Sequence, residues 1–359
     1  MNYVSIEELC EILNGYAFKS DNYVEEGVRI IRIANVQKGY IEDNTPVFCQ
    51  YDNLELEKYM LMENDLLISL TGNVGRVALL TKEFLPAALN QRVACLRLKN
   101  KEVLKKYLFY CLSANGFEEK CIRSAKGVAQ KNMSTEWLKK YKIPLYSSNE
   151  QIQIVRSLDF ISRTINNRKK QLQKLDELIQ ARFVEVFGDP VINSKNLRTM
   201  ALKDVLRLKA GDFTAASDIS DKLTETNKYP CFGGNGIRGY VTEYNQEGEY
   251  SLIGRQGALS GNVQFAKGKF RNTEHALLVI PMVEMNDIWL NQLLINLDLK
   301  RYQTGAAQPG LSVKNLQEIS IIMVPITEQN QFAAFVNQVN KSKLVIKNLL
   351  QIYKHQIQM

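Results

Sequence analysis

Apolar residues recur every three or four positions between residues 149 and 187, a spacing that predicts one long amphipathic helix. No Pro or Gly interrupts it before Gly188 and Pro190, which are typical helix-ending residues. At 1.5 Å per residue such a helix spans roughly 50–55 Å, more than a globular domain needs. The alternation is typical of a coiled-coil seam, broken once at Arg168. We therefore expect a partner helix, contacted through Ile154, Leu158, Ile161, Ile165, Leu172, Leu175 and Ile179.

The same spacing returns at the C-terminus, in residues 328–359. Its expected contact residues are Phe332, Val336, Val339, Ile346, Leu350 and Tyr353. A shift of 178 positions superimposes the two stretches, including Glu150-Gln151 on Glu328-Gln329. This match predicts a tandem repeat of two halves, each ending in a long helix. The alternative is two independent core helices whose apolar stripes happen to match.

Upstream of each long helix, short runs with strand-like alternation are separated by turns, and helices are expected over 101–117 and 289–299. The predicted fold is α+β, with two similar domains in a tandem repeat, each followed by a long coiled-coil-like helix. The expected domain boundaries are 1–148 for the first domain, 149–187 for the central helix, 188–199 for a linker, 200–327 for the second domain and 328–359 for the C-terminal helix.

Composition adds a weak indication of the partner. With 46 Lys and Arg against 38 Asp and Glu, the formal charge of +8 favours an anionic partner, nucleic acid above all. The six cysteines are scattered without CxxC spacing and are expected to be reduced thiols in a cytoplasmic protein. With only two histidines a metal site is not expected, and no apolar run is long enough to predict a membrane span.

One glycine-rich segment, residues 232–239, fits both the FxGxG pattern of methyltransferases and the GxGxxG pattern of dinucleotide-binding folds. Such sites need a helix after the glycines, but the following residues 240–244 are strand-like, so we expect a β-turn that could contact DNA. Walker, adenine-methylation and nuclease motifs are missing, and no catalytic residue or bound cofactor is expected.

Polar loops in both halves carry side chains suited to DNA. Arg can bond a guanine edge twice, Asn or Gln can do so with adenine, and Lys, Ser and Thr suit phosphates. Any one of these residues is more often a solvated surface residue, but they occur in matching loops. The candidates of the first half are Thr71, Asn73, Arg76, Asn90, Gln91, Arg92, Lys126, Gln130, Lys131 and Asn132. Those of the second half are Asn235, Arg238, Arg255, Gln256, Asn262, His275, Gln308 and Lys314.

Three segments and both helix starts carry a family likeness: residues 229–240, 254–257 and 304–312, together with Ile143-Pro144 and Val324-Pro325 before the two Glu-Gln pairs. With these features the chain resembles the DNA specificity subunit of type I restriction-modification systems. The first half departs from the second, because it has Gln130-Lys131-Asn132 where the second has Gln308-Pro309-Gly310 and lacks the glycine-rich turn.

The resemblance implies an α+β fold with two similar target recognition domains, separated by an antiparallel pair of long coiled-coil-like helices in a pseudo-twofold repeat. Each domain would read one part of a split, asymmetric site on double-stranded DNA. It also implies that the helices set the separation of the domains and dock methyltransferase subunits, which restriction subunits then join. S-adenosylmethionine and ATP would be bound by those partners and not by this chain.

Two other functions remain open at this point. The chain could be a self-contained DNA adenine methyltransferase, which binding of S-adenosylmethionine by the lone chain would reveal. It could instead be a coiled-coil interaction protein without sequence-specific DNA binding, which electrophoretic shifts on a randomised duplex pool would distinguish.

Overall fold

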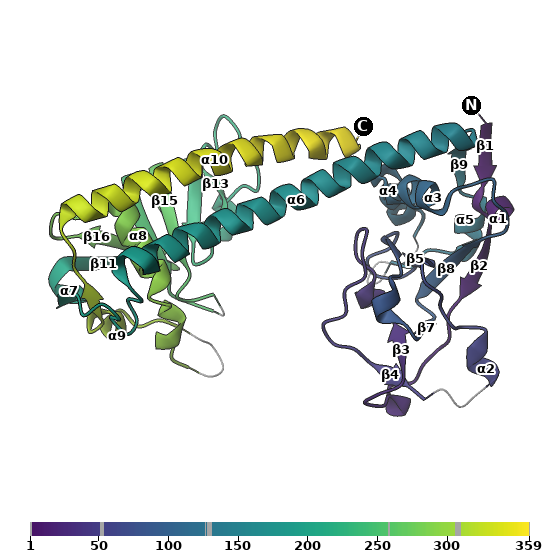
Figure 1. The fold of residues 1–359 in the computed structure, drawn as a ribbon, viewed down its shortest axis with the longest axis horizontal. Helices are drawn as coiled ribbons and strands as arrows, with labels where there is room; N and C mark the ends of the chain where they lie inside the picture. Colours follow the sequence, from purple (N-terminus) through teal and green to yellow (C-terminus); the bar gives the residue numbers. More distant parts are fainter. Residues whose placement is uncertain are drawn as a thin grey trace. The chain divides into compact units, whose positions relative to one another are not determined.

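The computed structural model describes residues 2–50, 54–125, 127, 131–257, 259–305 and 310–358 (Figure 1). The chain divides into two compact units. The first unit holds residues 1–167 and 350–359, and the second holds residues 168–349. Both are mixed helix and sheet, as the α+β prediction requires.

The described part of the first unit contains a four-stranded antiparallel sheet and a three-stranded sheet. The first has the order β2 (Cys10–Asn14), β8 (Val93–Leu98), β5 (Leu66–Ser69), β6 (Val77–Leu79). The second has the order β4 (Phe48–Cys49), β3 (Val28–Ile31), β7 (Ala87–Leu89), with β3 and β7 parallel. A separate pair joins β1 (Asn2–Ser5) to β9 (Lys142–Leu145).

Strand β5 is apolar on both faces because each face meets a different core. Leu66 and Ile68 point into one cluster with Tyr107 and Leu108, whereas Leu67 points into another with Cys95. This is the alternation of side chains expected along a strand. The short helices of the unit are α1 (Ile6–Leu9), α2 (Leu54–Glu57), α3 (Lys105–Ser113), α4 (Asn115–Ser124) and α5 (Thr135–Lys140).

The prediction of a single helix over residues 101–117 is wrong. It is replaced by α3 and α4, which are separated by Ala114 in an extended conformation with ψ at 142°. The break lets Leu112 of α3 and both Phe117 and Cys121 of α4 enter the same core. One straight helix would not place all three side chains on a single buried stripe, so core packing overrides the local preference.

The described second unit is built on a six-stranded sheet with the order β11-β16-β14-β15-β12-β13. The strands are β11 (Leu206–Ala210), β12 (Tyr229–Gly233), β13 (Gly236–Val241), β14 (Gln246–Gly254), β15 (Val263–Asn272) and β16 (Ala276–Pro281). Strands β12 and β13 form an antiparallel hairpin, which confirms the glycine-rich turn and excludes the strand–turn–helix of a cofactor loop. A separate pair joins β10 (Thr199–Ala201) to β17 (Ser320–Ile322).

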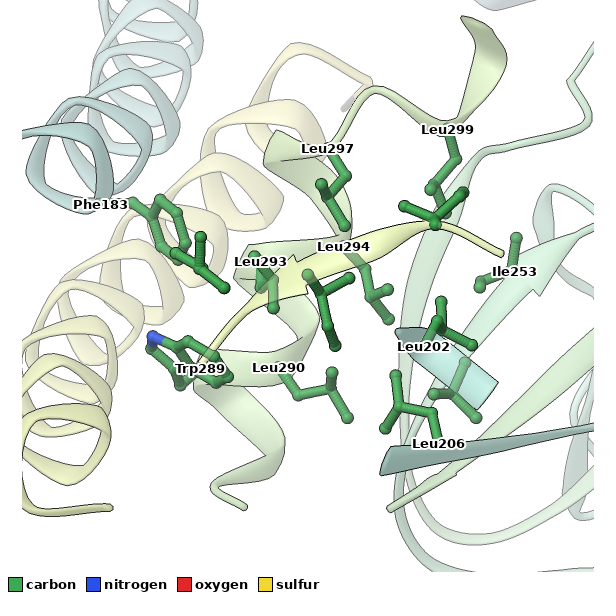
Figure 2. Packing of buried hydrophobic residues seen from close by; sticks show 14 of the residues in the cluster. Phe183, Leu202, Leu206, Ile253, Trp289, Leu290, Leu293, Leu294, Leu297 and Leu299 are labelled. Carbon is green, nitrogen blue, oxygen red and sulfur yellow. The ribbon is translucent and has the colours of Figure 1, made fainter. Parts of the chain in front are cut away.

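Helix α8 (Asp287–Asn296) contributes Trp289, Leu290, Leu293 and Leu294 to the core of this unit. Asn286 caps it by accepting hydrogen bonds from the backbone N–H groups of Ile288 and Trp289. Figure 2 shows Trp289 and the leucines of α8 packed between Phe183 and the sheet side of the cluster. Helices α7 (Leu202–Val205) and α9 (Val313–Gln317) complete the unit.

Two long helices, α6 (Ser148–Phe187) and α10 (Ile326–Gln358), confirm the predicted helical stretches (Figure 1). The part of each that lies in the second unit packs on the other. Phe183 meets Phe332 edge to face at 5.5 Å, and Asp176 pairs with Lys343, so the packed portions run antiparallel. Leu175, Ile179, Val336 and Val339 belong to the same cluster.

The remaining expected contact residues have different surroundings. Ile154 differs from the prediction, because it packs with Val155 against the core of the first unit where α6 leaves β9. Ile346 lines a groove with Leu175 and Leu178 in the second unit. Residues Leu158, Ile161, Ile165, Leu172, Leu350 and Tyr353 are buried or half-buried. Phe187, which the sequence prediction left out, continues the buried stripe.

Three further observations apply to the described residues only. None of their helices combines the length and apolarity needed to cross a bilayer. Their His, Cys, Asp and Glu side chains form no cluster able to hold a metal ion. Of the six cysteines, Cys111 is partly exposed and the other five are buried.

Candidate nucleic-acid interface

Three extended segments of the second unit run parallel and end at one edge. Strand β12 pairs with the end of β15 through Phe232 and Asn272, and Asp212, which follows β11, pairs with Thr273. The Thr273 N–H donates to the Phe232 carbonyl at 3.1 Å, and the Asp212 N–H donates to the Asn272 carbonyl at 3.1 Å. Because parallel strands end at the same edge, the residues that follow each segment lie close together. We call this the second-unit edge, which comprises residues 212–214, 233–235, 254–257 and 273–275.

Polar side chains on the second-unit edge bond to one another. The His275 ring carries Nδ1 at 2.7 Å from Gln256 Oε1 and Nε2 at 3.1 Å from Glu274 Oε1. Asn262 Nδ2 donates to Asn235 Oδ1 at 2.8 Å. These contacts hold amide, imidazole and carboxylate groups in fixed positions while leaving them partly exposed, which is the arrangement that reading of base edges needs.

Glycine permits the close approach of the backbone segments at this edge. A Cβ atom added to Gly254 would lie 2.1 Å from the Gly234 carbonyl oxygen, so no other residue fits there. The glycines at 233, 234 and 254 belong to the segments that carry the family resemblance, and the packing of one turn against another explains them. Their role is to bring Asn235 beside the strand end that carries Arg255 and Gln256.

Arg255 lies at the centre of the second-unit edge. Its backbone N–H donates to the His275 carbonyl at 3.1 Å, and its carbonyl accepts from the Leu311 N–H at 2.8 Å. The side chain is half-buried, and its Nε is buried with no acceptor among the described residues. A buried unpaired donor is costly, and one common reason for such a group is a ligand that supplies the missing acceptor.

The first unit contains an edge with the same backbone frame. The Leu70 N–H donates to the Arg92 carbonyl at 2.9 Å, and the Leu70 carbonyl accepts from the Met133 N–H at 2.8 Å. Thr71 bridges to Asn132 as Gln256 bridges to Gly310. Tyr16 bridges in parallel to Asn90 as Asp212 does to Thr273. Residues 16–18, 69–76, 90–92 and 131–133 are called the first-unit edge.

Most first-half candidates lie on the first-unit edge. Asn73, Gln91, Arg92, Lys131 and Asn132 are exposed there. Asn90 is 8% exposed, and its Oδ1 accepts from the Arg92 N–H at 3.2 Å, so it shapes the turn instead of facing solvent. The half-buried Arg76 donates to Gln37 Oε1 at 2.5 Å, and Thr71 Oγ1 is buried without a partner among the described residues.

The other second-half candidates are less central. Arg238 is exposed on β13, where its side chain covers Gly233, and Lys314 is exposed on α9. Lys126, Gln130 and Gln308 lie outside the described residues.

The thiol of Cys231, on β12, is a poor nucleophile, because burial raises its pKa. The guanidinium groups of Arg238 and Arg271 offset this rise only in part.

Sequence reasoning missed two residues on these edges, Glu274 and Phe213, and a third beside the first-unit edge, Arg32. Glu274 directly precedes the candidate His275, but the candidates suited to DNA were chosen among cations, amides and hydroxyls, so its carboxylate was passed over. Arg32 follows β3 beside Asn90, donates to the Thr45 carbonyl at 2.8 Å and has a buried Nε without an acceptor in the described chain. Phe213 is 76% exposed on the second-unit edge. For Arg32 and Phe213, only the parallel strand pairing reveals the location.

Comparison with known proteins gives consistent results. The family model described as type I restriction modification DNA specificity domain matches residues 1–177 and 194–352. The chain is 35% identical over 299 residues to the EcoprrI type I restriction enzyme specificity subunit of Escherichia coli, covering 77% of this chain and 71% of that protein. It is 24% identical to the EcoBI specificity subunit of the same species, covering 93% and 78%.

Solved structures support the fold. The type I restriction-modification S subunit from M. genitalium superimposes with a TM-score of 0.57 at 18% identity, covering 99% of this chain and 95% of that one. A chain from a structure of type I R-M complex assembly gives the same TM-score at 17% identity, again covering 99% and 95%. At these identities the similarity concerns the fold alone.

Proposed function

Because the chain belongs to the type I restriction-modification DNA specificity family, we propose that it reads a split, asymmetric DNA site for methyltransferase and restriction subunits. Family membership confirms the prediction of a DNA specificity subunit, which is the non-catalytic component of such a complex. It does not favour a self-contained adenine methyltransferase or an interaction protein without DNA specificity.

The proposal that this chain has two DNA-recognition sites rests on one observation: the two edges share a backbone frame but differ in side chains. The bonds of Leu70 to Arg92 and Met133 match those of Arg255 to His275 and Leu311. On this frame Thr71 and Arg92 of the first unit occupy the positions that Gln256 and His275 occupy in the second. A constant scaffold with different polar groups is what two half-sites of different sequence require.

The same correspondence supports a pseudo-twofold repeat with recognition domains at 1–148 and 200–327. Gln151 and Gln329, which are related by the shift of 178 positions, are both buried near the start of a long helix. Gln151 bonds to the backbone of Glu102, Leu104 and Tyr146, and Gln329 bonds to that of Asn286 and Val324. Each glutamine thus fastens a helix to its own domain.

The helices at 149–187 and 328–359 would act as the coiled-coil-like spacer and as the docking surface for methyltransferase subunits. The packing of Phe183 on Phe332 and of Asp176 on Lys343 supports an antiparallel pair. Four apolar side chains on these helices remain exposed: Leu178 at 46%, Val184 at 43%, and Leu344 and Val345 at 59% each. Exposed apolar surface of this kind is typical of a protein contact. S-adenosylmethionine and ATP would be bound by the partner subunits.

On the DNA, phosphate neutralisation would supply most of the affinity, and the two edges would supply the sequence preference. The residues proposed to read bases include the exposed Asn73, Gln91, Arg92 and Asn132 of the first unit and the exposed Asn235 and Gln256 of the second. The half-buried Arg255 and His275 of the second unit complete the set. Lys131, Arg238 and Lys314 are better suited to phosphates, since they are exposed cations.

The proposal is tested by selection from a randomised duplex pool with the full chain bound to its methyltransferase subunit. We expect two short enriched motifs separated by a spacer of constant length and free sequence. The matched control is the methyltransferase subunit alone, which should enrich nothing. A single continuous motif, or enrichment that is the same without this chain, would contradict the proposal.

A further inference from the structure

Phe213 is an aromatic side chain exposed at the DNA-reading edge of the second unit. It is 76% exposed, although a residue of this size and apolarity is normally buried. It follows Asp212, which is paired in parallel with Thr273, so Phe213 and Glu274 leave their strands side by side. Neighbouring strands are about 4.8 Å apart, which places the Phe213 backbone within roughly 10 Å of the strand that leads to Asn235.

The backbone that carries Phe213 is held on both sides. Arg271 donates through Nη2 to the Phe213 carbonyl at 3.3 Å and through Nε to Thr214 Oγ1 at 3.2 Å. Asn245 Nδ2 donates to the Asp212 carboxylate at 2.8 Å. The exposed ring therefore extends from a fixed backbone. Fixed placement lowers the entropic cost of a contact with a ligand.

The surroundings of Phe213 indicate what it contacts. Gln256, Glu274 and His275 on the same edge offer hydrogen bonds, and Arg271 and Arg238 provide positive charge nearby. This chemistry suits base edges in the major groove, where the 5-methyl of thymine is the apolar group that the bases display. A phenylalanine among base-reading polar groups is thus matched to a thymine methyl.

Resting on the proposed function, we propose that Phe213 is a specificity-determining residue that packs against the 5-methyl group of a thymine in the half-site read by the second unit. The first-unit edge carries a different aromatic group. Tyr16, paired with Asn90, is 40% exposed and packs on Phe18 and Tyr59 at ring distances of 5.0 and 5.3 Å. Phe213 is more exposed, and it is placed to contact a ligand directly.

The test measures binding of the full chain, in complex with its methyltransferase subunit, to the selected site with single thymines replaced by deoxyuridine. One replacement in the second-unit half-site should weaken binding of the unaltered protein about fourfold, the factor expected for loss of one buried methyl group. Phe213→Ala should bind the thymine duplex more weakly and should respond to the replacement by less than about 1.5-fold, because the methyl then loses its apolar partner.

Two variants serve as controls. Met282→Ala removes an apolar side chain of 50% exposure from beyond the far end of β16, and it should leave the deoxyuridine response intact. Tyr16→Ala, on the first-unit edge, should also leave it intact. Since Phe213 is exposed, its replacement is not expected to unfold the second unit.

The outcomes separate the two proposals. If the unaltered complex selects a split site but tolerates every deoxyuridine, the role of Phe213 is refuted while the proposed function stands. If Phe213→Ala binds the thymine and deoxyuridine duplexes more weakly by the same factor, the deoxyuridine response is retained. This result also refutes the role of Phe213 and indicates a wedge or backbone contact. If the unaltered complex selects no site at all, the proposed function itself fails.

Discussion

At the scale of single residues, hydrogen bonds between side chains decide which groups remain for DNA. When His275 carries its proton on Nδ1, it donates to Gln256 Oε1 and occupies one of the two acceptor lone pairs of that oxygen, while the amide N–H groups of Gln256 keep their full donor capacity for a ligand. Bidentate bonding to adenine needs both the carbonyl and the N–H of an amide, whereas guanine O6 and N7 need donors only. In this state Gln256 is better suited to guanine than the pairing rule for free glutamine indicates.

The prediction at the residue scale concerns the effect of Arg255 on base preference. Replacing it with alanine should relax the preference at one base position of the second-unit half-site by about 1–3 kcal/mol, the typical worth of a bidentate arginine–guanine contact. Preferences in the other half-site should not change, because the backbone bonds of Arg255, to His275 and Leu311, lie within the second unit. Competition binding against a panel of single-base variants of the selected site measures both effects.

Lys314→Ala is the matched control for Arg255, since it removes one exposed cation of the same unit. It should weaken binding similarly on all sequences, as loss of a phosphate contact does. Uniform weakening by Arg255→Ala as well would show that Arg255 also contacts phosphate and would remove it from the base-reading set.

At the scale of elements, the start of each long helix depends on a buried side-chain amide. Gln151 accepts from the Leu104 N–H and donates to the carbonyls of Glu102 and Tyr146, with distances of 2.9 Å. This arrangement ties α6 to the loop before α3 and to the end of β9. Alanine would leave these backbone groups unpaired in a partly buried place, which costs more than the loss of an exposed hydrogen bond.

We therefore predict that Gln151→Ala lowers the free energy of unfolding of the first unit by about 1–3 kcal/mol. Gln153→Ala, which alters an exposed glutamine on the same helical turn, should change it by less than about 0.5 kcal/mol. Urea unfolding followed by circular dichroism gives both values. Equal effects of the two substitutions would mean that the Gln151 amide does not fasten the helix, and Gln329 with Gln331 repeats the test in the second unit.

At the scale of the whole molecule, we expect charge to govern the affinity for DNA and the two edges to govern the sequence preference. The chain carries a formal charge of +8, and its exposed lysines and arginines suit phosphates. Each phosphate contact releases condensed counterions from DNA, so affinity falls with salt. Hydrogen bonds to base edges release no counterions, and the ratio between specific and mismatched sites should depend much less on salt.

The prediction at this scale concerns salt. Between 50 and 200 mM salt the affinity for the selected site should fall by about 10³-fold or more, as expected for six or more phosphate contacts. The ratio of affinities for matched and singly mismatched sites should change by less than about threefold, since it reflects base contacts. Fluorescence anisotropy titrations on both duplexes give these quantities, and an affinity indifferent to salt would exclude phosphate contact as the main source of binding.

The amino-acid sequence by itself determined the long helices, the glycine-rich turn and most polar loops of the edges. Helical periodicity and turn residues act over a few positions, so the printed sequence reveals them directly. The family resemblance is also visible in the sequence, through its segments at 229–240 and 254–257, although the packing of Gly254 on Gly234 explains why glycines stand there.

The tertiary structure alone decided which groups meet. Phe213 reaches the second-unit edge because Asp212 pairs with Thr273, a partner far along the chain that no local pattern specifies. Asn90 is buried in a turn, Ala114 divides a helix because the core needs residues from both sides, and Ile154 serves the core of the first unit. Strand pairing and core packing are non-local, so they emerge only when distant segments come together.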